Sequence, residues 1–151
     1  ANPTVLEVFF YSEYAVRDEI GDRLIDNRDL FITGKIRDTH VGYARSQFER
    51  LKRREGSFSS DTAKRTAKHA RHLLRLVRQA EHALTTGTFD IAALDREEIF
   101  AFGELEHAEM CRRAEREIER VKAVPSVLPP EPDLAAINEL LLSVRWDDYR
   151  G

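Results

Sequence analysis

The stretch from Ser60 to Leu84 holds the side chains of this 151-residue chain that are best suited to bind an anion. On a helical period, four polar side chains share the stripe that would face outward: Lys68, His72, Arg75 and Gln79. Four further cationic side chains flank it: Lys64, Arg71, Arg78 and His82. Glu81 is the one acid among six Lys or Arg and three His between positions 64 and 82.

This charge pattern differs from that of an ordinary solvated helix face. Faces that serve only solubility mix charge signs and pair acids with bases four residues apart. Like charges along one face repel each other, so we expect an anion to lie there, with a plain solvated face as the alternative. A phosphate chain or a nucleic-acid backbone is the natural ligand.

A helix must present this face, and the sequence provides one. The opposite stripe of the same stretch is apolar and is predicted to face a core: Ala70, Leu73, Leu74, Val77, Ala80 and Leu84. Ser60 or Asp61 is suited to cap the start of the helix. Gly87 is suited to end it in a left-handed conformation.

Other kinds of chemistry have weaker signals. Two Arg–His pairs, Arg65 with His72 and Arg75 with His82, have six residues between their members. Some helical ribonucleases use an Arg followed by a His, in which the His moves a proton and the Arg stabilises phosphate charge. Such a spacing arises easily by chance on a helix rich in these residues. The sequence has no zinc-ligand spacing, no Walker A loop and no GxGxxG motif.

The bulk composition restricts the class of protein. The net charge is −3, so the basic charge is local and favours a site over a general polyanion coat. The single cysteine, Cys111, excludes an intramolecular disulfide and is predicted to be a small buried residue. No apolar run approaches the length of a membrane span, so we expect a cytoplasmic protein that does not bind membranes.

The predicted fold is mainly α, a helical bundle of about five helices with one N-terminal β-strand. The strand covers residues 4–11, which are β-branched and aromatic. Helices are predicted at 14–25, 34–54, 60–84, 95–102, 104–122 and 133–146, with Asp95 and Asp133 as caps. Glu104, Glu106 and Glu109 are interpreted as favourable charges at a helix start. A lone strand needs a partner, from a missing segment or a second copy, unless it packs on the helices as an extended arm.

Several short stretches, taken together and in order, resemble a known family. They are Asn2-Pro3-Thr4-Val5-Leu6-Glu7, Gly42-Tyr43-Ala44 with Gln47, Lys68 to Leu76, Thr86-Gly87, Gly103-Glu104, and Ser126-Val127-Leu128-Pro129 before Pro132-Asp133. The set resembles the C-terminal portion of predicted nucleotidyltransferases of the DNA polymerase beta superfamily, found in bacteria and phages and linked to RNA repair. The resemblance runs from Asn2 to about Trp146.

The resemblance implies a two-part enzyme that transfers a nucleoside monophosphate from a nucleoside triphosphate to an acceptor such as RNA. Its α/β head would carry a Gly-Ser loop and acidic residues that hold Mg²⁺. This sequence has neither motif, so residues 1–12 would be the last strand of a head that lies upstream. Residues 13–146 would be the helical substrate-binding domain, followed by a tail at 147–151.

The resemblance also implies roles for particular residues. Lys68, His72 and Arg75 would line the cleft and neutralise phosphate, with Lys64, Arg71 and Arg78 in support. Tyr43 and Gln47 would stack on and hydrogen-bond a base, or else are residues at the edge of the core. Glu7 would be the one catalytic candidate in this chain, although a structural role for it is the alternative.

Three functional interpretations remain open at this point. The first is the substrate-binding part of a nucleotidyltransferase, inactive by itself. The second is a self-sufficient, metal-independent ribonuclease that uses Arg65 with His72 or Arg75 with His82. The third is a non-enzymatic helical module that grips RNA or DNA.

Overall fold

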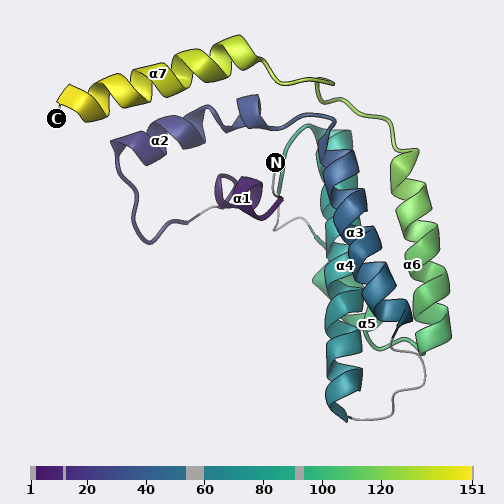
Figure 1. Cartoon of the computed structure of the whole chain (residues 1–151). Coiled ribbons are helices and arrows are strands. Elements are labelled where there is room, and N and C mark those ends of the chain that lie inside the picture. The colour runs from purple at the N-terminus through teal and green to yellow at the C-terminus, as the bar shows by residue number, and fades with distance from the viewer. Residues whose placement is uncertain (1–2, 12, 54–59, 91–93, 151) are drawn as a thin grey trace.

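The computed structural model describes residues 3–11, 13–53, 60–90 and 94–150, and these residues are mainly helical (Figure 1). The helices are α1 (Pro3–Val8), α2 (Glu19–Asp26), the 3₁₀ helix η1 (Arg28–Phe31), α3 (Ile36–Lys52), α4 (Ser60–Thr86), α5 (Arg96–Phe102), α6 (His107–Lys122) and α7 (Leu134–Arg150). None of the described helices combines the length and apolar character needed to span a bilayer. The predicted helical bundle is confirmed.

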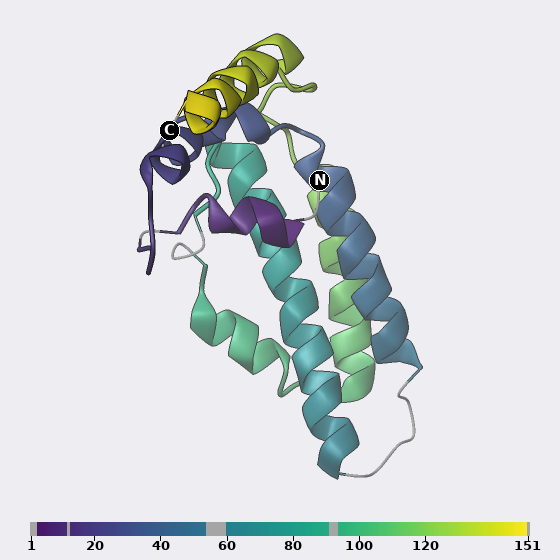
Figure 2. The same cartoon turned by 60° about the vertical axis from the view of Figure 1, so that its left-hand side comes forward.

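The core lies where α3, α4 and α6 run side by side, with α5 packed against α4 (Figures 1 and 2). The apolar stripe predicted for α4 lies at its centre, since all six of its residues are at most 1% exposed. Leu51 from α3, Phe102 from α5 and Ile118 from α6 complete the same cluster. Burial of this stripe fixes the rotation of α4 and therefore determines where its cations point.

The predicted N-terminal strand is wrong. Residues 3–8 form the short helix α1, and the described ranges contain no strand. Pro3 stands at the first helical position, where its missing N–H costs nothing. In this helical arrangement some backbone groups pair locally, as in the bonds from Phe9 N to Leu6 O and from Phe10 N to Glu7 O. Residues 4–11 therefore present no strand edge with which a second copy or an upstream head could pair.

Most helix ends follow the sequence signals. Asp95 Oδ1 accepts from Glu98 N at 2.9 Å, and Asp133 Oδ1 accepts from Ala136 N at 3.0 Å. Gly87 ends α4 with φ of 78°, as predicted for a left-handed cap.

Three helices depart from the predicted bounds. Helix α2 begins five residues later than predicted, at Glu19, because Asp18 provides the cap by accepting from Gly21 N. Helix α6 begins at His107 rather than at 104, because Glu106 provides the cap, and α7 continues through the predicted tail to Arg150.

Helices α2 and α7 lie together beyond one end of the three-helix bundle (Figure 1). The extended crossing after α6 is held by backbone bonds from Gly34 N to Pro129 O at 2.8 Å and from Val127 N to Leu84 O at 2.9 Å. Helix α7 then returns along α2, and Arg23 Nη2 donates to Ser143 Oγ at 2.5 Å.

Candidate anion-binding surface

Cationic and imidazole side chains from α3 and α4 gather on one side of this helix pair. This group is named the α3–α4 cationic surface, and its members are Arg50, Lys68, His69, His72 and Arg75. Arg50 and Lys68 are exposed, whereas the other three are partly buried. No described carboxylate forms an ion pair with Arg50 or Lys68. The two outermost charges of the surface are therefore open toward solvent within the described part of the chain.

His72 lies at the centre of this surface. Burial, followed by the positive charges of Arg75, His69, Lys68 and Arg50, holds the pKa of His72 below its ordinary value. A group so surrounded by cations is in a field that attracts anions. A bound phosphate would oppose this shift, because a negative charge favours the protonated imidazole.

The two residues predicted to contact a base have different surroundings. Tyr43 is 44% exposed on α3, so its ring is accessible for stacking. Gln47 is 8% exposed, and its Oε1 lies 2.7 Å from His69 Nδ1. Gln47 therefore orients His69 and joins α3 to α4, while Tyr43 keeps an accessible ring on the face of α3 that also carries Arg50.

Gln79, which the helical period placed on the outward stripe, is in fact only 2% exposed. Helix α1 crosses this part of α4 (Figure 2) and covers it. Gln79 Nε2 donates to Glu7 Oε1 at 3.1 Å, and Arg75 Nη1 lies 3.5 Å from Glu7 Oε2. The carboxylate of Glu7 is thus a built-in anion at one end of the cationic surface.

A buried histidine lies near the same end of the surface. His40 on α3 is 1% exposed, and its Nδ1 lies 3.0 Å from Ile36 O. Burial lowers the pKa of His40 to about 4, and the charge of Arg75 acts in the same direction. His40 is consequently a neutral core residue at neutral pH.

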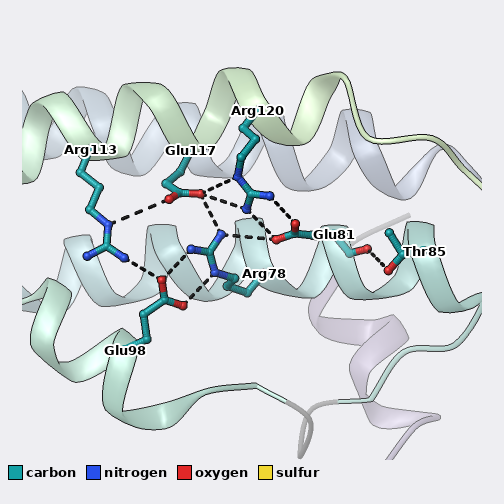
Figure 3. Close-up of polar contacts among 7 residues, drawn as sticks. All are labelled: Arg78, Glu81, Thr85, Glu98, Arg113, Glu117 and Arg120. Atoms are coloured by element: carbon teal, nitrogen blue, oxygen red, sulfur yellow. Dashed lines mark hydrogen bonds and ion pairs between the residues drawn. The ribbon is translucent and has the colours of Figure 1, made fainter.

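Arg78, a predicted flanking cation, belongs to an ion-pair network on a different side of α4 (Figure 3). Arg78 Nη2 lies 2.6 Å from Glu98 Oε1, and Arg78 Nη1 lies 2.7 Å from Glu117 Oε2. Arg113 and Arg120 of α6 extend the network to the same acids and to Glu81. These pairs neutralise Arg78 and connect α4 to α5 and α6.

Arg71 is also engaged in packing. Its guanidinium lies 4.6 Å from the centroid of Phe100 and pairs with Glu104. Gly103 permits this arrangement, because a Cβ there would lie 2.8 Å from Arg71 Cγ and 2.4 Å from Arg71 Nε. Lys64, the third flanking cation, is exposed near the start of α4.

The catalytic hypothesis for Glu7 has no support in its surroundings. Glu7 is 5% exposed and faces the amide nitrogen of Gln79 and the guanidinium of Arg75, which are hydrogen-bond donors and do not ligate Mg²⁺. Among the described residues, no group of three or more His, Cys, Asp or Glu is arranged to hold a metal. The described residues around Glu7 therefore do not fit a magnesium site.

Two members of the cationic surface were missed in the sequence. Arg50 is seven residues after Tyr43, on the same face of α3, and the charge-rich end of that helix hid its position. His69 is next to Lys68, but only the packing of α3 on α4 turns it toward Gln47. Arg50 and His69 join the surface only because α3 packs on α4. The periodicity of a single helix does not reveal how two helices pair.

A hollow of about 200 Å³ lies elsewhere, between α1 and the start of α2. Its lining is mostly apolar and includes Val8, Phe9 and Ile25. None of its lining residues belongs to the cationic surface.

Comparisons of the chain with protein-family models, with curated proteins and with solved structures found no match. The resemblance to nucleotidyltransferases therefore stays a prediction from sequence.

Proposed function

We propose that the α3–α4 cationic surface binds phosphate groups of a nucleotide or an RNA, as the helical substrate-binding part of a nucleotidyltransferase. One observation carries this proposal. The charges of Arg50, Lys68 and Arg75 converge on His72 from two helices, and no described carboxylate pairs with the outer two. These unneutralised cations repel one another, and a bound polyanionic ligand would relieve that repulsion.

The side chains of the surface suit different parts of such a ligand. Arg50 offers a planar guanidinium for bidentate phosphate contacts, and Lys68 offers a compact point charge. Tyr43, 44% exposed on the same helix as Arg50, offers a ring on which a base can stack. A phosphate chain with an adjoining base matches this combination better than an isolated anion does.

In the proposed parent enzyme, a Gly-Ser and D-x-D head with Mg²⁺ would act on the α-phosphate of the triphosphate. The role of this chain would be to hold the triphosphate or the RNA acceptor. Its cations would also neutralise phosphate charge.

The proposal is tested by titrating the chain with a fluorescent ATP analogue and with a short single-stranded RNA at low salt. We expect Lys68→Ala and Arg50→Ala each to weaken binding by about fivefold, as for one lost charge-assisted contact. Arg112→Ala is the matched control, because it removes an exposed cation that pairs with Glu109 on α6. Equal affinity of Lys68→Ala, Arg112→Ala and the unmodified chain would overturn the proposal.

Salt and ligand preference separate this function from plain nucleic-acid gripping. A weaker salt dependence in Lys68→Ala would show that Lys68 contacts phosphate. Preference for nucleotide, or activity on addition of an upstream head, would favour the nucleotidyltransferase. Binding of RNA with no affinity for nucleotides would favour a non-enzymatic module.

A metal-independent ribonuclease is the second candidate. The lowered pKa of His72, caused first by burial and then by neighbouring cations, leaves its imidazole neutral and able to accept a proton near pH 7. Arg65 lies on the same side of α4, two turns earlier. RNA cleavage in the presence of a chelator, abolished by His72→Ala, would establish this function. Intact RNA under those conditions would exclude it.

A further inference from the structure

The cations of the α3–α4 cationic surface are spread along the bundle. Helices α3 and α4 are antiparallel (Figures 1 and 2), and the contact of Gln47 Oε1 with His69 Nδ1 at 2.7 Å sets their register. Arg50 is three residues beyond Gln47 on α3, and Arg75 is six residues beyond His69 on α4. Because the helices run in opposite directions, these two arginines lie on opposite sides of the contact. At about 1.5 Å per residue, their backbones are about 13.5 Å apart along the bundle.

Two further contacts agree with this register. The charge of Arg75 acts on His40, which precedes Gln47 by seven residues and therefore lies at nearly the level of Arg75. The guanidinium of Arg75 reaches Glu7, whose carboxylate also accepts from Gln79, one turn further along α4. The positive charge of Arg75 is thus held away from Arg50, and the surface keeps its full length.

Tyr43 lies between the two ends of this surface. It is four residues before Gln47, on the face of α3 that carries Arg50, and its side chain is 44% exposed. Arg50 and Lys68 lie on one side of this level along the bundle, and Arg75 lies on the other. A nucleoside triphosphate carries its phosphates on one side of its base, whereas an internal nucleotide of a strand has a phosphate on each side. The order of these residues therefore suits a strand.

The length of the surface and the exposed ring favour the same ligand. At about 3.4 Å per nucleotide, the distance from Arg50 to Arg75 corresponds to about four nucleotides of one strand. A triphosphate is shorter, because its phosphate groups share bridging oxygens. The exposed ring of Tyr43 can stack on a base only if that base has left its own stack, which single strands allow and duplexes oppose.

We propose that the α3–α4 cationic surface holds a single-stranded nucleic acid over about four nucleotides, with one base stacked on Tyr43. Arg50 and Lys68 contact the phosphates on one side of that base. Arg75, whose side chain is 36% exposed, contacts those on the other side. The carboxylate of Glu7 repels phosphate, so the strand leaves the surface before it reaches α1.

This inference rests on the proposed phosphate binding and names its ligand. In the proposed parent enzyme, the strand would be the acceptor of the transferred nucleotide. ATP would bind too, but more weakly, because it can occupy only part of the surface.

The first test is competition against a fluorescent single strand of about eight nucleotides, followed by anisotropy at low salt. The competitors are unlabelled di- and tetranucleotides without terminal phosphates, ATP and inorganic triphosphate. We expect the tetranucleotide to bind at least about tenfold more tightly than the dinucleotide, ATP or triphosphate. Since the tetranucleotide carries fewer negative charges than ATP, charge alone would give the opposite order. The RNA and DNA forms of one sequence show whether the sugar matters, and this length dependence in either form supports the proposal.

The second test removes the ring. Tyr43→Ala should weaken tetranucleotide binding by about tenfold, as for one lost stacking contact, and leave the affinity for inorganic triphosphate unchanged. Tyr43→Phe should bind normally, because stacking needs the ring and not the hydroxyl group. Tyr11→Ala is the matched control, since Tyr11 is 46% exposed outside the cationic surface. Circular dichroism checks that the variants stay helical.

The outcomes separate this inference from the proposed function. If ATP binds as tightly as the tetranucleotide and Lys68→Ala weakens both, phosphate binding stands and the strand is overturned. Equal tetranucleotide affinity of Tyr43→Ala and Tyr11→Ala would also overturn the strand, as would tighter binding of a duplex than of a single strand of the same length. If Lys68→Ala changes the binding of none of these ligands, the proposed function fails, and the strand fails with it.

Discussion

Arg75 Nη1 lies 3.5 Å from Glu7 Oε2, and Glu7 is only 5% exposed. This ion pair brings one acid from α1 to the end of a surface that is otherwise cationic. Gln79 Nε2 donates to the same carboxylate at 3.1 Å, so the charge is held by two partners on α4. The contact both attaches α1 to the bundle and reduces the positive charge near His72.

Replacing Glu7 should therefore have opposite effects on stability and on binding. Glu7→Gln removes the partner of Arg75, and we expect a loss of about 1–3 kcal/mol in the free energy of unfolding. The same change removes the negative charge beside the surface and should tighten RNA binding. Urea denaturation and RNA titration measure the two effects. Glu131→Gln is the control, because it removes an exposed acid that pairs with Lys35. Weaker RNA binding by Glu7→Gln would contradict the inference that Glu7 reduces the positive charge of the surface.

Leu74 tests the rotation of α4. It is 0% exposed within the core, so Leu74→Ala should cost about 2–5 kcal/mol of unfolding free energy. Val127→Ala, at a side chain that is 67% exposed, should cost far less. Urea midpoints of the two variants provide the measurement. A change below about 0.5 kcal/mol for Leu74→Ala would mean that this face of α4 does not point into the core.

Arg78 tests the ion-pair network. Its side chain is 19% exposed and pairs with Glu98 and Glu117, whose side chains are 25% and 15% exposed. Arg78→Ala leaves these partly buried acids short of a partner, and we expect a loss of about 3 kcal/mol. Arg116→Ala, at an arginine whose side chain is 67% exposed, is the control and should change stability by less than about 1 kcal/mol. Equal melting temperatures for the two variants would contradict a structural role for the network.

The network also predicts a loss of stability in acid. The hydrogen bond from Arg78 holds the pKa of Glu98 below its ordinary value, and that from Arg120 does the same for Glu81. Burial pushes the pKa of Glu117 up, but Arg78 and Arg120 together bring it below the ordinary value. Groups with lowered pKa bind more protons when unfolded, so their stabilisation is present above about pH 4.5 and is lost as pH falls further. The urea midpoint of Arg78→Ala should fall less steeply in this range than that of the unmodified chain.

As the pH is lowered, protonation of His40 in the unfolded chain should reduce stability at a higher pH than protonation of the network acids does. Burial lowers the pKa of His40 to about 4 from an ordinary value of 6.5. The unfolded chain therefore binds a proton that the folded chain rejects, so stability falls as pH decreases from about 6.5 to about 4. His40→Gln removes this titration and should flatten the urea midpoint across that window, even though the variant is less stable at pH 7. An unchanged slope would mean that His40 is protonated in the folded chain.

The sequence by itself determined the features that depend on neighbouring residues. The apolar spacing of residues 70–84 set which side of α4 faces the core, and the structure buries that side. The caps at Asp95, Asp133 and Gly87 were predictable for the same reason. Helix periodicity and capping depend on residues a few positions apart, so they can be recognised in the sequence without the tertiary structure.

Tertiary structure alone decided which cations of α4 remain open. Arg71, Arg75 and Arg78 look alike in sequence, yet the first pairs with Glu104, the second with Glu7 and the third with Glu98 and Glu117. These acids come from α1, α5, α6 and the turn before α6, far from α4 along the chain. The same long-range packing covers Gln79 with a helix formed by residues that the pattern predicted as a strand. Local propensity gave way there because a short helix pairs part of its backbone locally and packs on α4, whereas a lone strand has no partner among the described residues.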